Sequence, residues 1–114
     1  MITVYLTAAI LCIGEVCYPA LVGKTTPVGE FQLVQLLTDD PGYSGDVVQF
    51  AEDDHQIYAI HRIYLLNPSQ HRERRLKSTN ARDRIITDGC INVDPVVYKK
   101  IVECCVAQKL IIKR

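Results

Sequence analysis

Cys90 is the residue of this chain whose type and surroundings are best suited to chemistry. It follows Gly89 directly and precedes a short apolar segment, residues 91–93. A cysteine thiolate is a strong nucleophile, and backbone N–H groups freed by a small neighbour can stabilise the oxyanion that forms when it attacks a carbonyl. The sequence therefore predicts acyl transfer, with Cys90 as the nucleophile and the backbone N–H groups of Asp88, Gly89 and Cys90 as the oxyanion hole.

Three histidines could act as the general base that takes the thiol proton. His61 lies inside an apolar run, residues 56–66, that is expected to be an interior strand, whereas His55 lies in an acidic loop and His71 in a basic loop. A base has to be held within about 3 Å of the thiol, which a strand does better than a loop. We therefore expect His61 to be the base, and His71 is the alternative.

Three segments of the chain occur in a recognisable order. They are Gly23-Lys24-Thr25-Thr26-Pro27-Val28-Gly29-Glu30-Phe31, Tyr58-Ala59-Ile60-His61 and Arg84-Ile85-Ile86-Thr87-Asp88-Gly89-Cys90-Ile91-Asn92-Val93. In their residues and order they resemble the catalytic domain of the L,D-transpeptidase family of cell-wall enzymes, over most of the chain from residue 18 to residue 93. In that family the histidine follows an apolar strand, as in Ile60-His61.

The chain departs from the family's pattern in two places. The gap of 29 positions between His61 and Cys90 is longer than the family's usual gap, while the 19 positions from His71 to Cys90 match it. The family commonly has Ser-His-Gly-Cys where this chain has Thr87-Asp88-Gly89-Cys90. Relative to the family's pattern, the chain resembles a variant that has Asp88 in place of the histidine. This change leaves an oxyanion hole of backbone N–H groups intact.

The resemblance implies a two-step reaction on the tetrapeptide stem of peptidoglycan. Cys90 would attack the carbonyl before the terminal D-alanine and form a thioester. An amine of a second stem would then complete transpeptidation, or water would complete L,D-carboxypeptidation of a recycled muropeptide. The resemblance also implies acylation of the thiol by carbapenems. The alternatives are a catalytically inactive cell-wall peptide-binding module and a toxin-type effector that exchanges D-amino acids.

Three further residues are expected to bind substrate. Asn92 matches an Asn or Arg of the family and would bind substrate or brace the loop, Arg84 would pair with a substrate carboxylate, and Thr87 belongs to the same motif. No metal or other cofactor is expected, since the His, Cys and acidic residues do not fall at ligand spacing.

The pattern predicts one mainly β domain, residues 1–114, with a β-sandwich or barrel-like L,D-transpeptidase fold and one main C-terminal helix. Strands are expected over residues 2–12, 16–22, 31–37, 47–50, 56–66 and 109–113. The helix is expected to begin at Asp94-Pro95, because an aspartate N-cap followed by proline is a typical helix start. Residues 69–84 are expected to form a loop with one helical turn at residues 73–77.

The charge distribution and the apolar runs indicate which partners and which compartment to expect. The formal net charge is zero, which gives no indication of nucleic-acid binding, but residues 71–84 carry six basic side chains that could attract a carboxylate substrate to the thiol. No apolar run reaches membrane-span length. Without a visible signal peptide the chain is expected to be cytoplasmic as given, or periplasmic if a signal was removed. The oligomeric state is left open.

Five cysteines cannot all be paired within one chain. Cys12 and Cys17 would face each other across a hairpin turning at residues 14–15, as a disulfide in an oxidising compartment or as two buried thiols in a reducing one. Cys104 and Cys105 are expected to diverge on the C-terminal helix and to act as small hydrophobic residues.

Overall fold

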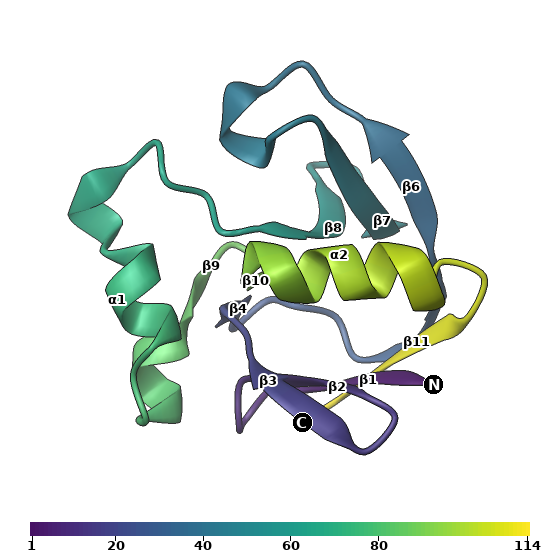
Figure 1. Cartoon of the computed structure of the whole chain (residues 1–114), viewed down its shortest axis with the longest axis horizontal. Coiled ribbons are helices and arrows are strands. Elements are labelled where there is room, and N and C mark those ends of the chain that lie inside the picture. Colours follow the sequence, from purple (N-terminus) through teal and green to yellow (C-terminus); the bar gives the residue numbers. More distant parts are fainter.

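The computed structural model describes all of residues 1–114 and shows strands in three sheets around one long helix, so the predicted mainly β fold is confirmed (Figure 1). The first sheet has the spatial order β3-β2-β1-β11-β5, and its strands are β1 (Ile2–Tyr5), β2 (Ile10–Ile13), β3 (Val16–Pro19), β5 (Gly29–Gln32) and β11 (Lys109–Lys113). The second has the order β10-β8-β7-β6, and its strands are β6 (Val34–Leu37), β7 (Asp46–Glu52), β8 (Ile57–Arg62) and β10 (Ile91–Val93). A small third sheet pairs β4 (Val22–Gly23) with β9 (Ile85–Thr87).

Helix α2 (Pro95–Cys104) lies between the first two sheets (Figure 1). Its predicted start is confirmed, because the Asp94 side chain accepts a hydrogen bond of 2.8 Å from the N–H of Val96. The helix buries Val97, Tyr98 and Ile101 against strands of both sheets. No helix of the chain is long and apolar enough to cross a membrane.

The predicted first strand, residues 2–12, is wrong as a single element. The structure has two antiparallel strands there, β1 and β2, joined by a turn in which Ala9 has a φ of 51°. This run contains no glycine or proline, so no local signal marks the turn. The turn is stabilised from a distance, since the Arg84 guanidinium donates hydrogen bonds to the carbonyl oxygens of Ala8 (2.8 Å) and Ala9 (3.1 Å).

Two further predicted strands divide between sheets. Residues 16–22 split into β3 in the first sheet and the start of β4 in the third. Residues 31–37 split into β5 in the first sheet and β6 in the second, with the buried Leu33 between them. Alternating apolar residues indicate which side chains are buried, but not at which residue a chain leaves one sheet for another.

The basic segment between β8 and β9 is more ordered than predicted. It contains a 3-10 turn at Pro68–Gln70, helix α1 (Arg72–Leu76) and a second 3-10 turn at Ala81–Arg84. A further 3-10 turn, Pro41–Tyr43, connects β6 to β7. Helix α1 lies to one side of the sheets (Figure 1), and its first residue, Arg72, lines a cavity together with Cys90 at the start of β10.

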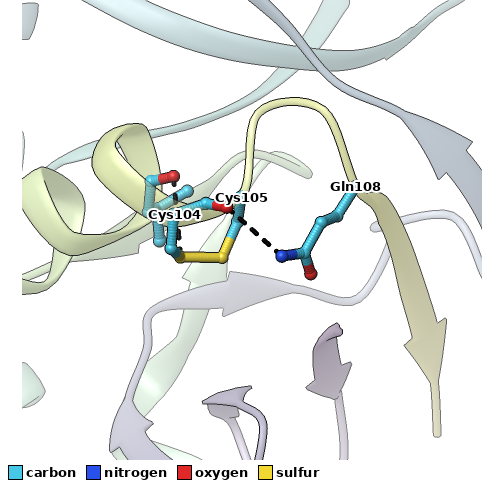
Figure 2. The surroundings of a disulfide bond; sticks show 4 residues. Cys104, Cys105 and Gln108 are labelled. Atoms are coloured by element: carbon cyan, nitrogen blue, oxygen red, sulfur yellow. Dashed lines mark hydrogen bonds between the residues drawn. A yellow bond between two sulfur atoms is a disulfide. The ribbon is translucent and has the colours of Figure 1, made fainter.

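Four of the five cysteines are paired. Cys12 and Cys17 are register partners on β2 and β3 and form a disulfide, as the hairpin allows. Cys104 and Cys105 form a second disulfide (Figure 2), so the prediction that their side chains diverge is wrong. The helix ends at Cys104, and the backbone of Cys105 leaves helical geometry, which turns the two side chains toward each other. Cys90 is the free cysteine.

Candidate active site

The parallel pairing of β8 with β10 brings Cys90 and His61 to one face of a sheet. Asn92 on β10 is the register partner of His61 on β8. Side chains two positions apart on a strand point the same way, so Cys90, directly before β10, faces the same side as Asn92 and His61. Cys90 and His61 both line a cavity of about 280 Å³. No hydrogen bond joins the two side chains.

The alternative base, His71, lies elsewhere. It is exposed, caps helix α1 with a φ of 51°, and lines a different cavity from Cys90. The structure therefore favours His61 over His71 as the imidazole nearest the thiol.

The surroundings of Cys90 favour the protonated thiol over the thiolate. Burial raises the pKa of Cys90, although the N–H of Ala59 and the charge of Arg72 act in the opposite direction. The Sγ atom lies 3.7 Å from the carbonyl oxygen of Ile57, an acceptor for the thiol proton. Attack by this sulfur on a carbonyl would therefore require a base that removes the thiol proton.

His61 is neutral and held in one orientation. Burial lowers its pKa to about 4, and its side chain is almost fully enclosed. Nδ1 lies 2.6 Å from the carbonyl oxygen of Arg62, which can only accept, so Nδ1 carries the proton. Nε2 therefore carries the lone pair, which accepts a long hydrogen bond of 3.3 Å from the Asn92 amide. A neutral imidazole with this lone pair can accept a proton.

The first of the three resembling segments supports the loop that carries Cys90. The Thr25 hydroxyl donates to the carbonyl oxygen of Asp88 at 2.9 Å, and the buried Thr26 hydroxyl donates to that of Gly89 at 2.9 Å. Both hydrogen bonds fix peptide planes next to the nucleophile. Segment 23–31 therefore supports the structure of the loop that carries Cys90.

Thr87 organises the same loop from within. Its hydroxyl donates to the carbonyl oxygen of Cys90 at 2.6 Å and accepts from the N–H of Gly89 at 3.1 Å. The Gly89 N–H is therefore already engaged, which corrects its predicted place in the oxyanion hole. The N–H groups of Asp88 and Cys90 donate no hydrogen bond within the chain. Thr87 lines the pocket, but its hydroxyl is engaged in hydrogen bonds with the loop. The side chain of Asp88 is exposed and also lines the pocket.

Gly89 meets two requirements that only glycine satisfies. Its φ of 130° is one that L side chains rarely adopt, and a Cβ there would lie 2.4 Å from the Tyr58 ring. Gly23 is also confined, because a Cβ would lie 2.3 Å from the carbonyl oxygen of Thr87. The turn before Cys90 is thus tightly packed on both sides.

The prediction that Arg84 binds a substrate carboxylate is wrong. Arg84 is buried, and its guanidinium donates to the carbonyl oxygens of Ala8, Ala9 and Ser78. It holds the β1–β2 turn and does not line the Cys90 cavity. Asn92 is fully buried, and its side-chain amide bonds to His61, Arg72 and the N–H of Tyr64.

The guanidinium at the pocket belongs to Arg72, which the sequence did not single out. Arg72 lines the Cys90 cavity, and its Nη1 donates to Oδ1 of Asn92 at 2.7 Å. The concentration of six basic residues in positions 71–84 was the available signal. Which of the six reaches the thiol depends on the path of α1, which local sequence does not fix.

The thiol also borders a second, apolar cavity of about 230 Å³. Its walls include Leu36, Leu37, Val47 and Ile57, together with Cys90. The Cys90 sulfur thus lies between a polar cavity lined by Arg72 and an apolar cavity beside the edge strand β6.

Comparison with known proteins places this fold among the L,D-transpeptidases. No family model matches the chain, and no curated protein matches it. Solved L,D-transpeptidase structures from Stackebrandtia nassauensis, Mycobacterium tuberculosis (L,D-transpeptidase 1) and Mycobacterium smegmatis do match, with TM-scores of 0.60, 0.57 and 0.58 and identities of 14%, 15% and 16%. Each match covers 99% of this chain but only 54%, 58% and 58% of the other chain, respectively. The protein therefore has the L,D-transpeptidase fold and spans little more than half the length of those proteins.

Proposed function

We propose that the protein is a cysteine acyltransferase that acts on peptidoglycan tetrapeptide stems. The observation that carries the proposal is the cavity shared by the free thiol of Cys90 and the neutral imidazole of His61, within this fold. In the first step Cys90 Sγ bonds to the carbonyl carbon that precedes the terminal D-alanine. The thiol proton passes to His61 Nε2 and then to the departing amine, so that D-alanine leaves and a thioester remains.

The second step returns the enzyme to its starting state. An amine of another stem attacks the thioester and gives a crosslink, or water attacks and gives a tripeptide. In both cases the attacking group gives its proton to His61, and the sulfur leaves as the thiol. Two cavities border Cys90, and either an amine or water could reach the thioester through them. Analysis of the product, a crosslink or a tripeptide, distinguishes the two reactions.

Turnover of a purified disaccharide tetrapeptide tests the proposal. Wild type should release D-alanine, Cys90→Ala should release none, and His61→Ala should be slower by roughly 10²- to 10⁴-fold, the usual contribution of a general base. His71→Ala is the matched control and should retain wild-type turnover. An equal loss in His61→Ala and His71→Ala would contradict the choice of base.

A peptide-binding module without catalysis is the second candidate. Two findings favour it, namely the raised pKa of Cys90 and the hydrogen bond that occupies His61 Nε2. A binding module would bind the tetrapeptide in wild type and Cys90→Ala with equal affinity and release no D-alanine. Release of D-alanine by wild type would exclude it.

We also propose that the protein works in an oxidising compartment, such as the periplasm. The two disulfides support this, because disulfides persist in oxidising compartments and are rare in a reducing cytoplasm.

A further inference from the structure

Arg72 is fixed in the wall of the Cys90 cavity. Its Nε donates to Oε1 of Gln70 at 2.8 Å, and its Nη1 donates to Oδ1 of Asn92 at 2.7 Å. The centre of the guanidinium also lies 5.6 Å from the centroid of the Tyr64 ring, within range of a cation–π contact. The side chain is therefore held in place before any ligand binds.

The guanidinium has no anionic partner. The ion pairs of the chain are Arg62 with Asp46 and Lys77 with Glu73, and neither involves Arg72. Its two hydrogen bonds go to neutral side-chain oxygens, which leaves three of the five guanidinium N–H groups free. A partly buried cation without a counter-charge is costly, and the cost is offset when an anion binds.

No other Lys or Arg lines this cavity, while Tyr43, Gln56, Tyr64 and Thr87 supply neutral polar atoms. The exposed Asp88 is the one acidic residue there and forms no ion pair with Arg72. The guanidinium of Arg72 is thus the one cationic group that lines the cavity with the thiol, although the charge of Asp88 also acts on both groups.

We propose that Arg72 binds a carboxylate of the substrate next to the bond that Cys90 attacks. A guanidinium binds a carboxylate through two parallel N–H donors, which fixes both position and orientation. The inference rests on the proposed function for the identity of the substrate, a peptide acid whose free terminal carboxylate lies one residue beyond the scissile carbonyl. Arg72 is then a specificity residue that selects free peptide acids over peptide amides.

Arg72 and Tyr64 also border a larger open cavity of about 590 Å³, which contains Arg74 and Lys77. Arg74 is on the same helix as Arg72 and is exposed, but it does not line the Cys90 cavity. Arg74→Gln is therefore a matched control that removes one positive charge from α1 without touching the proposed carboxylate site.

Alkylation of the single free thiol tests the charge at Cys90 without any substrate. Iodoacetate carries a carboxylate and iodoacetamide is its neutral amide, so the ratio of their rates reports an anion site beside the sulfur. We expect Arg72→Gln to lower this ratio by roughly fivefold to tenfold, as expected for one nearby charge pair. Arg74→Gln should change it less than twofold. The wild-type ratio should fall on raising the salt from 10 mM to 500 mM, because salt screens the attraction.

Arg72→Lys separates carboxylate binding from the support of Asn92. Lysine keeps the positive charge but lacks the two parallel N–H donors of the guanidinium, so part of the preference for iodoacetate should remain. Removing the Arg72 charge also reduces the thiolate fraction, because the guanidinium lowers the pKa of Cys90, but this slows both reagents equally and cancels in the ratio of their rates. An unchanged ratio in Arg72→Gln, or an equal fall in Arg74→Gln, would overturn the inference.

Substrate pairs test the specificity. Wild type should process the tetrapeptide acid with a lower KM than its C-terminal amide, and Arg72→Gln should raise KM about tenfold or more for the acid alone. Equal effects on acid and amide would overturn the inference. If wild type processes neither peptide, the proposed function fails, and the alkylation ratio still decides whether Arg72 forms an anion site.

Discussion

Asn92 and His61 are register partners on adjacent parallel strands, and the Asn92 amide nitrogen lies 3.3 Å from His61 Nε2. The amide oxygen of the same Asn92 accepts from Arg72 at 2.7 Å. One buried amide thereby positions both the imidazole and the guanidinium of the pocket. This relationship connects the basic segment around α1 to the face of the sheet that carries His61 and Cys90.

Asn92→Ala is expected to impair both stability and turnover. It removes the acceptor of Arg72 Nη1 while the bond from Nε to Gln70 remains, and the lost hydrogen bond should lower the free energy of unfolding by about 1–3 kcal/mol. It also removes one of the two hydrogen bonds that hold the His61 ring, so kcat should fall by roughly tenfold or more if that bond positions the base. Urea unfolding and D-alanine release measure the two effects. Asn67→Ala, at an exposed asparagine outside the Cys90 cavity, should change stability by only about 0.5 kcal/mol.

Acid should destabilise the protein through His61. Its folded-state pKa of about 4 lies below the ordinary value of 6.5, so between these pH values the unfolded chain binds more protons. Stability therefore rises with pH across this window and is complete above about pH 6.5. His61 alone should account for a loss of about 3 kcal/mol between pH 7 and pH 4.

The comparison of wild type with His61→Gln isolates this contribution. Acidic residues with lowered pKa values, such as Asp46, titrate in both proteins and cancel in the difference. The free energy of unfolding of His61→Gln should fall less between pH 7 and pH 4 than that of wild type, by about 3 kcal/mol. Parallel pH profiles for the two proteins would show that His61 is not buried as a neutral group.

Gly89→Ala should be more damaging than Gly45→Ala. Both glycines have positive φ values, 130° and 111°, so both substitutions introduce backbone strain of about 1–3 kcal/mol. Only Gly89 faces an obstacle, the Tyr58 ring at 2.4 Å, whereas a Cβ at Gly45 meets nothing within 4 Å. We expect Gly89→Ala alone to slow alkylation of Cys90 by iodoacetamide. Equal unfolding free energies in the two variants would contradict the tight packing of the loop.

Thiol titration should count one free cysteine. Protein isolated from its own cells and denatured without reductant should give one thiol, and the same protein after reduction should give five. Cys90→Ala should give none before reduction. Five thiols without reductant would place the protein in a reducing compartment and contradict both disulfides.

Much of the site could be predicted from sequence because its residues lie in short segments with local signals. Cys90 follows a glycine that the turn requires, and His61 lies in a strand where an imidazole is unusual. The Asp94-Pro95 helix start is equally local, and it is confirmed. Each of these features is fixed by neighbours in sequence.

The errors concern contacts between distant segments. Arg84 and Arg72 belong to the same basic stretch, yet Arg84 reaches the carbonyl oxygens of a turn 75 residues away while Arg72 reaches Asn92. The division of residues 2–12 into two strands depends on that same long-range contact. Charge alone indicates that a cationic region exists, but the path of α1 decides which side chain faces the thiol.

The most direct test of the central claim is the intact mass of the protein after incubation with a carbapenem. An activated Cys90 should open the lactam and retain the whole drug, so wild type should gain the mass of one drug molecule. Cys90→Ala should gain nothing. No adduct on wild type, or an adduct that persists in Cys90→Ala, would contradict the proposal that Cys90 is an acyl acceptor.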